Sequence, residues 1–408
     1  MANAFKNTTL VTRYAVIDFE NALQMAGRVD RQAEKEFRKV GQTIKVRRPV
    51  RFETESGATI SSSTDIEEGT IDVTLDQRHH VSFTVDSDDM TLEVDDFRER
   101  YVRPAMEELA QNVENELADS YKRIYNFVGT PGTTPASFLA VANAKKLLDE
   151  TGVPTSLPKD AFYDPEAIVN LADALKGVFP DSISRRAIEN AMIKRIGDFT
   201  IYQNNSLKNH TVGVATGTPL VNGASQNVTY AASKDTWTQS LVTDGWTNST
   251  TGILLEGDVF TIAGVNSINQ RTRADTGNLQ TFVVTADADS GASTGPATLT
   301  ISPPIITSGP YQTVTAAPAD NAAITVKTGT GGTTHRQNLA FAKNAITLAT
   351  APLDMPPGSV EASQATHKGV SIRTVVFYNG TTDVSTWRFD ILYGVKVQNP
   401  GFAVRTTG

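Results

Sequence analysis

The 408-residue chain contains no cysteine. This absence excludes disulfide frameworks, cysteine-ligated zinc, iron–sulfur clusters and a thiol nucleophile. No stretch approaches the ~18 to 20 consecutive apolar residues that a membrane-spanning helix needs, and Arg13, Asp18 and Glu20 interrupt the N-terminus before an apolar core of signal-peptide length forms. We therefore expect a soluble protein that is made and stays in the cytoplasm, without contact to a membrane.

Positive charge and catalytic motifs are also scarce. Lys and Arg number 37 against 45 Asp and Glu, a net charge of −8, so the chain as a whole has no basic excess for gripping nucleic acid. No metal-ligand spacing joins the five histidines, no GxSxG occurs, and the Gly-rich GTGGTTH at 329–335 lacks the GK[ST] ending of a phosphate-binding loop. We expect no enzyme, no catalytic or metal residues and no cofactor.

Composition divides the chain into three parts. Residues 1–210 are charged and partly helical, whereas 211–335 are rich in Thr, Ser, Gly, Ala and Val and hold only four cations. Short β-rich runs there, such as NVTYAA and QTFVVTA, recur between turn residues and predict a β-barrel or sandwich. After about residue 336 the earlier character returns. The pattern predicts a small all-β domain inserted into a surface loop of a larger α+β domain.

The remaining parts show both helical and strand periodicity. The predicted elements are a polar helix over 22–40, an extended β-hairpin with a polar tip over 43–85, a long helix over 104–128 that begins at Pro104 or Asp95 and stops at Gly129, a helix from Thr134 to Gly152, and a helix from Asp164 and Pro165 onward. A hairpin this long is only marginally stable alone. We expect it to lie on a neighbour.

Charged residues of opposite sign gather in separate segments. The acidic group comprises Asp86, Asp88, Asp89, Glu93, Asp95, Asp96 and Glu99, and the basic group comprises Arg28, Arg31, Lys35, Arg38, Lys39, Lys45, Arg47, Arg48 and Arg51. Three interpretations are open. The groups are solvated faces, with acidic side chains favoured at a helix N-terminus; or complementary patches that join subunits head to tail; or a carboxylate site for catalysis or a divalent cation.

Four segments carry a resemblance to a known family. They are VDDFRERYVRPAMEELAQNVENELA in the long helix, IKRIGDFTIYQNNSLKNHTVG before the insertion, LLEGDVFTIAGVNSINQRTRADTGNLQTFVVT within it, and WRFDILYGVKVQNPGFAVRTTG at the C-terminus. In this order they resemble the major capsid (coat) proteins of tailed bacteriophages, with the Hong Kong phage type of fold. The inserted β domain is similar to the immunoglobulin-like or barrel-like insertion in coat proteins of short-tailed phages.

The resemblance implies a division of the α+β chain into the regions of a phage capsid fold. These are an N-terminal arm over 1–42, an extended loop over 43–86, a peripheral domain over 87–179 with the spine helix 95–128, an axial domain from 180–210 and 336–390, the inserted β domain over 211–335, and a C-terminal strand and tail over 391–408. In this family the extended loop overlaps an adjacent subunit.

The resemblance also implies a function. The protein would be the major capsid protein that self-assembles, as hexamers and pentamers, into the icosahedral shell around the double-stranded phage genome. A procapsid would form with a scaffolding protein and a portal protein in the host cytoplasm, mature as DNA is packaged, and become part of the virion. Packaged DNA would be bound without sequence specificity.

Roles for individual charged residues follow as expectations. Contacts between subunits are expected from Arg47, Arg48, Arg51, Glu53, Glu55, Asp65, Glu67, Glu68, Asp86, Asp88 and Asp89, and inner-face DNA contacts from Arg28, Arg31, Lys35, Arg38, Lys122 and Arg123. Two other functions stay open. One is a non-viral nanocompartment shell of the same fold; the other is a carbohydrate-binding surface or tail protein, with Trp237, Trp246 and Tyr230 stacking on sugar rings.

Overall fold

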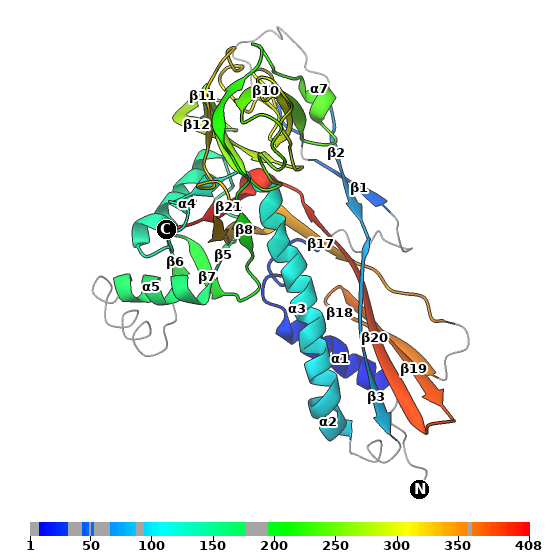
Figure 1. The fold of residues 1–408 in the computed structure, drawn as a ribbon. Helices are drawn as coiled ribbons and strands as arrows, with labels where there is room; N and C mark the ends of the chain where they lie inside the picture. The colour runs from blue at the N-terminus through cyan, green and yellow to red at the C-terminus, as the bar shows by residue number, and fades with distance from the viewer. Residues whose placement is uncertain are drawn as a thin grey trace. The chain divides into compact units, whose positions relative to one another are not determined.

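Figure 1 shows the computed structural model of the chain, a mixed α+β fold as the sequence predicts. The structure describes residues 8–31, 43–48, 50–52, 66–86, 94–175, 195–356 and 361–408. Two compact units are present, one from Met1–Val46, Asp72–Ala118 and Ile346–Lys396, the other from Arg47–Ile71, Asp119–Ala345 and Val397–Gly408. Within the described ranges, no helix is long and apolar enough to cross a membrane.

A five-stranded sheet is the base of the first unit. Its strands are β3 (Gln77–Asp86), β17 (Ile346–Thr350), β18 (Glu361–His367), β19 (Val370–Asn379) and β20 (Val384–Val397). The long strand β20 pairs antiparallel with both β19 and β3. Two further strands, β1 (Thr43–Arg47) and β2 (Thr70–Thr74), pair with each other. The predicted hairpin therefore holds only for its outer part, because the arm over 77–86 pairs with β20 instead.

Helix α1 (Thr8–Ala22) covers β18 and β19 of this sheet. It buries Val11, Ala15 and Phe19, which recur every four residues and so share one face. The helix predicted over 22–40 is wrong in its described part, since α1 ends at Ala22 and turns follow. The backbone N–H groups of residues 24–26 donate to the buried carboxylate of Glu114, at 3.0 Å each, rather than to helical carbonyls.

The long helix begins where the sequence predicts but ends earlier. It runs without a break through α2 (Val94–Phe97), the π-helical turn η3 (Arg98–Val102), α3 (Arg103–Asp119) and the 3₁₀ turn η4 (Ser120–Arg123). The π-turn, in which the Arg103 N–H donates to the Arg98 carbonyl, directly precedes Pro104, which has no N–H to donate. Ile124 is already extended. The predicted continuation to Val128 is wrong because Phe127 and Val128 form strand β4, which pairs with the C-terminal strand.

The second unit contains a six-stranded mixed sheet in the order β4, β21 (Ala403–Thr406), β16 (Asn338–Ala342), β5 (Lys159–Tyr163), β7 (Phe199–Gln203) and β6 (Arg195–Ile196). Helices α4 (Phe138–Glu150) and α5 (Pro165–Leu175) share its apolar core. Asp164 caps α5 as predicted, accepting the Ala167 N–H at 3.2 Å. The predicted cap of α4 at Thr134 is wrong, because the Ser137 hydroxyl accepts the Ala140 N–H and starts the helix there.

The inserted all-β domain is a six-stranded barrel, which is one of the two architectures that the sequence predicts. Its strands are β9 (Gly217–Val221), β10 (Gln239–Trp246), β11 (Val259–Ile268), β12 (Asp275–Val284), β13 (Ala297–Ser302) and β14 (Ile324–Val326), with the short helix α7 (Tyr230–Ser233). The sheet closes through a bridge between Leu220 and Ala323, which leaves no open edge. The chain enters through β8 (Asn209–Thr211) and leaves through its antiparallel partner β15 (Thr334–Arg336). Short 3₁₀ turns η5 (Lys343–Ala345) and η6 (Pro400–Phe402) complete the unit.

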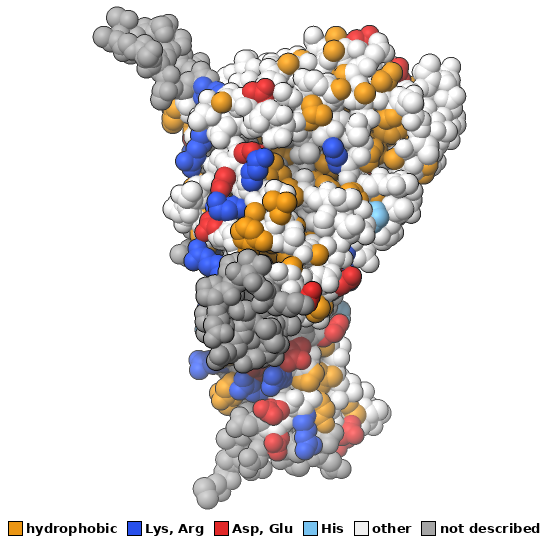
Figure 2. Space-filling view, turned by 90° about the vertical axis from the view of Figure 1, so that its left-hand side faces the viewer, with side chains coloured by type: hydrophobic (Ala, Val, Ile, Leu, Met, Phe, Trp, Pro, Cys, Tyr) orange, Lys and Arg blue, Asp and Glu red, His pale blue; other side chains and the backbone are white. Residues whose placement is uncertain are grey.

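The barrel surface is poor in charge. Its strands and connections over 217–326 contain only three cations, Lys234, Arg271 and Arg273. In the view of Figure 2, the upper part of the molecule, where the barrel lies, is mostly uncharged. The inside is a continuous apolar cluster that includes the fully buried Phe260, Phe282 and Leu299. The barrel is therefore held together by apolar packing rather than by ion pairs.

The two units divide the chain differently from the regions that the resemblance implies. Residues 346–390 lie in the unit that contains α3, whereas 195–210 lie in the unit that contains the barrel. The assignment of arm, extended loop, peripheral, axial and C-terminal regions stays a prediction.

We predict that Glu114→Gln destabilises the protein by about 1 to 2 kcal/mol, because one carboxylate oxygen that accepts backbone N–H groups is replaced by a donor. Glu107→Gln, on the exposed face of the same helix, is the matched control and should change stability by less than about 0.5 kcal/mol. Urea unfolding measures both values. Hydrogen exchange should be faster at residues 24–26 in Glu114→Gln only; unchanged exchange there would contradict the assigned role.

Candidate functional site

An aromatic cluster of the barrel domain packs against Arg48, Arg51 and residues 67–70 of the predicted hairpin. These residues lie at the end of the β1–β2 pair that faces the tip, and we call them the hairpin base because the tip extends from them. Tyr230, Trp237, Ile306 and Tyr311 are buried together. The rings of Tyr230 and Tyr311 are stacked with centroids 3.6 Å apart and planes 3° apart, and Trp237 meets Tyr230 edge-on at 6.3 Å. These rings form a rigid apolar platform with polar edges.

Two arginines from the hairpin lie on this platform. The Arg48 guanidinium is 5.1 Å from the centre of the Trp237 ring, and that of Arg51 is 5.7 Å from the centre of the Tyr311 ring. Arg51 also donates through Nη2 to Gln270 Oε1 at 2.6 Å. Burial lowers the pKa of Arg48 to about 10 and that of Arg51 below its usual value, yet both remain charged near neutral pH. Both contacts are cation–π interactions within one chain.

Hydrogen bonds fix the returning strand of the hairpin to the same platform. Asp235 Oδ1 accepts from the N–H and the hydroxyl of Thr70, at 3.0 and 2.9 Å. The Tyr311 hydroxyl is 3.4 Å from the Glu67 carbonyl. Gly69 lies so close to the barrel that a Cβ there would be 2.6 Å from the Lys234 carbonyl oxygen. The base of the hairpin is thus tightly held by the barrel of its own chain.

Other residues expected to make subunit contacts lie on the outside. Arg47 and Glu68, with side chains 77% and 43% exposed, form an ion pair at 3.0 Å. Glu67 and Asp86 are exposed. Glu53, Glu55, Asp65, Asp88 and Asp89 lie outside the described residues. The structure therefore brings Arg48 and Arg51 together in one intramolecular site and leaves Arg47, Glu67, Glu68 and Asp86 at the surface.

Four of the six residues expected at DNA are near the N-terminus, and the structure describes two of them. Arg28 is exposed in the turn after α1. Arg31 pairs with Glu20 at 3.1 Å and donates through Nε to the Ala26 carbonyl at 2.9 Å, with only 15% of its side chain exposed. Arg31 therefore holds the turn in place. Lys35 and Arg38 lie outside the described residues.

The other two, Lys122 and Arg123, are at the end of the long helix in η4. Lys122 pairs with Asp119 at 2.8 Å. Arg123 pairs with Glu256 of the barrel domain at 2.7 Å and donates through Nη1 to the Thr285 carbonyl at 2.9 Å. Both positive charges are thus balanced by carboxylates of the same chain, and Arg123 connects the helix end to the barrel.

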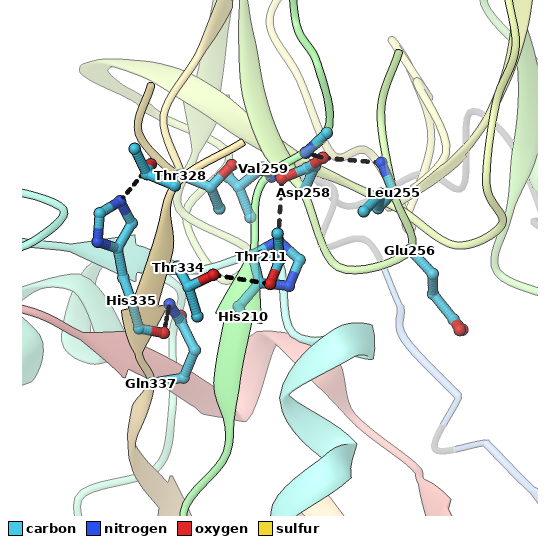
Figure 3. Close-up of polar contacts among 12 residues, drawn as sticks. His210, Thr211, Leu255, Glu256, Asp258, Val259, Thr328, Thr334, His335 and Gln337 are labelled. Atoms are coloured by element: carbon cyan, nitrogen blue, oxygen red, sulfur yellow. Dashed lines mark hydrogen bonds and ion pairs between the residues drawn. The ribbon is translucent and has the colours of Figure 1, made fainter. Parts of the chain in front are cut away.

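A buried carboxylate joins the chain segments at the foot of the barrel (Figure 3). Asp258, with no exposed surface, accepts hydrogen bonds from His210 Nε2 at 2.9 Å and from the Thr328 hydroxyl at 2.8 Å. Its other oxygen accepts the N–H groups of Gly213 and Leu255, at 2.9 and 2.8 Å. Burial would raise the pKa of Asp258, but the hydrogen bonds, that of His210 first, outweigh burial and hold the pKa below its usual value.

Next to this carboxylate lies a buried cation. Arg405, in β21, has no exposed surface, and its guanidinium is 5.7 Å from the ring centres of both Tyr121 and Phe127. Burial lowers its pKa to about 10. The Tyr121 hydroxyl is 3.2 Å from His210 Nδ1. Through Arg405, Tyr121 and His210, the C-terminal strand, the end of the long helix and the strand that enters the barrel therefore contact one another in the interior.

No local pattern in the sequence indicates these two clusters, because their members are far apart along the chain: Arg51 contacts a tyrosine 260 positions away. The interpretation of Trp237, Trp246 and Tyr230 as sugar platforms does not hold, since they are 8%, 2% and 8% exposed and belong to apolar clusters. Among the described residues, no group of three or more His, Asp or Glu is arranged to hold a metal ion.

Comparison with known proteins gives a consistent result. A family model described as "P22 coat protein - gene protein 5" matches residues 1–408. The major capsid protein of Acyrthosiphon pisum secondary endosymbiont phage 1 is 28% identical over 313 residues, 74% of this chain and 73% of that protein.

Two solved structures are also similar to the chain. One from Mycobacterium phage Che8 is 12% identical, with a TM-score of 0.47, and the match covers 94% of this chain and 90% of that one. The CUS-3 coat protein I-domain is 33% identical with a TM-score of 0.20, over 28% of this chain and 97% of that one.

We predict that Asp258→Asn destabilises the protein by about 3 kcal/mol at pH 7, because His210, Gly213 and Leu255 lose a charged acceptor. A carboxylate with a lowered folded pKa stabilises fully above its unfolded pKa of about 3.9, and this contribution is lost as the pH falls through the folded value. The deficit of the variant should therefore shrink below about pH 4. Urea unfolding between pH 3 and 7 measures it, with Asp244→Asn as the control; a pH-independent deficit would contradict the account.

Proposed function

Because this chain belongs to the P22 coat protein family and is a phage major capsid protein that forms an icosahedral shell, we propose that the extended loop predicted over 43–86 overlaps a neighbouring subunit through its outer part, beyond β3. One observation carries the proposal: the base of the hairpin is fixed on the barrel, while Phe52 and Ile66 on either side of its tip are 67% and 64% exposed. Large apolar side chains exposed next to a rigid base are typical of a surface that a partner covers.

We further propose that the regions act as the family resemblance implies, with 1–42 as the arm, 87–179 as the peripheral domain that includes the spine helix, and 180–210 with 336–390 as the axial domain. The structure describes the spine helix over 94–123. The barrel stabilises its own subunit, because its contacts in the structure run to the hairpin base, to η4 and to β8 through Arg48, Arg123 and Asp258. The function is structural, and a shell subunit needs no catalytic residue.

Assembly partners follow from the same reasoning. Copies of the chain form the shell, and we propose that a scaffolding protein and a portal protein take part in a procapsid built in the host cytoplasm. Packaged double-stranded DNA would contact the inner face without sequence specificity, through the basic residues expected there. This contact would weaken as the salt concentration rises, because binding to phosphates releases counterions.

We predict that replacing residues 53–65 by a short Gly-Ser linker leaves the melting temperature of the subunit within about 3 °C of the wild type but abolishes shells. Deletion of all of 43–86 would not test assembly alone, because it would also remove β3 from the five-stranded sheet of the first unit. Electron microscopy and sedimentation after an assembly reaction measure the result, with circular dichroism as the check on folding. Shells of normal yield and size would refute the overlap role.

The exposed pair Arg47 and Glu68 provides a second prediction. Each reversal, Arg47→Glu or Glu68→Arg, should change subunit stability by less than about 1 kcal/mol, because both side chains are largely in solvent. The double reversal restores the ion pair within the chain. It does not restore the proposed contacts of the two side chains with a neighbouring subunit, so assembly of the double variant should remain slower than that of the wild type. Light scattering during assembly measures the rate; full recovery in the double variant would limit the pair to its own chain.

A further inference from the structure

A small pocket lies beside the hairpin base. Its volume is about 160 Å³, and Arg48, Arg51, Trp237, Gln270 and Tyr311 are among the residues that line it. No Asp or Glu is found among these lining residues, all of which the structure describes. The pocket thus joins two guanidinium groups and has no carboxylate in its wall.

The two cations are incompletely satisfied. Arg48 Nε and Arg51 Nη1 are buried without a hydrogen-bond partner within the described chain. The carboxylate that attracts Arg48, that of Asp235, already accepts two hydrogen bonds from Thr70. Burial lowers the pKa of Arg48, and the charge of Arg51 lowers it further. Buried charges are costly unless they are paired, so this arrangement favours an added negative charge.

We propose that this pocket binds an oxyanion, a carboxylate or a phosphate, between the guanidinium groups of Arg48 and Arg51. Planar guanidinium groups bind both chemistries through paired N–H donors. The volume equals that of about five water molecules in the liquid, which admits one carboxylate side chain or one free phosphate. In the shell, two sources are available: an acidic side chain of a second copy of this chain, whose net charge is −8, or phosphate from solution.

Phosphate binding to the unassembled subunit does not depend on the proposed overlap between subunits. Whether the oxyanion in the shell comes from a neighbouring copy or from solution does rest on that proposed overlap. The first arm therefore uses the full-length, unassembled chain and inorganic phosphate as the probe, at constant ionic strength, in a calorimetric titration. The wild type should bind one phosphate per chain. Arg48→Gln with Arg51→Gln should weaken binding at least tenfold. Arg47→Gln, which changes the exposed arginine next to Arg48, should not change binding.

A second variant guards against misfolding of the first. Gln270→Glu keeps the acceptor for Arg51 Nη2 and adds a negative charge at the pocket wall. It should raise the melting temperature in phosphate-free buffer and abolish phosphate binding. No phosphate binding by the wild type, or equal binding by wild type and both pocket variants, would overturn the proposal.

The second arm compares assembled shells with free subunits. Shells that no longer take up phosphate would support an acidic side chain of a neighbouring copy as the occupant, and shells that bind one phosphate per subunit would support the free anion. Both results support the oxyanion site. If the chain forms no shells, the overlap role fails, but the titration of the free subunit still decides the pocket.

Discussion

The contact between the hairpin base and the barrel's aromatic platform is the constraint on which the proposed role of the protein depends. Arg48 over Trp237 and Arg51 over Tyr311 fix the outgoing segment, and the Thr70 bonds to Asp235 fix the returning one. A two-stranded ribbon alone is marginally stable and has no defined direction. Attachment to the barrel orders the described residues on both sides of the tip, which lowers the conformational entropy that the proposed contact with a neighbour would cost.

The inserted barrel is therefore more than an addition to the surface. Asp258 connects its strand β11 to His210 at its entrance, and Arg123 connects the end of the long helix to Glu256. These contacts are polar and buried or half-buried, whereas the barrel interior is apolar. Apolar packing accounts for the stability of the barrel, and a few directional hydrogen bonds and ion pairs set how it is attached within its unit.

Sequence periodicity predicted the start of the long helix, the cap of α5 at Asp164 and the inserted β domain, because each depends on local pattern or capping. It failed where a contact with a residue far along the chain determines the local structure. Glu114 takes the N–H groups that would have continued α1, and β21 takes Phe127 and Val128 from the predicted helix. The aromatic partners of Arg48 and Arg51 lie more than 180 positions away, and no local pattern indicates them. The expected contact of these arginines with other subunits stays a prediction.

The central claim is that the hairpin, held at its base by the barrel, crosses onto an adjacent subunit. A cryo-electron microscopy reconstruction of assembled shells, at a resolution that shows side chains, tests it most directly. The account predicts that Arg48 and Arg51 keep their contacts with Trp237 and Tyr311 of the same chain, while Phe52 and Ile66 are buried against a neighbour. A map in which both apolar side chains remain in solvent, with every hairpin contact inside its own subunit, would contradict it.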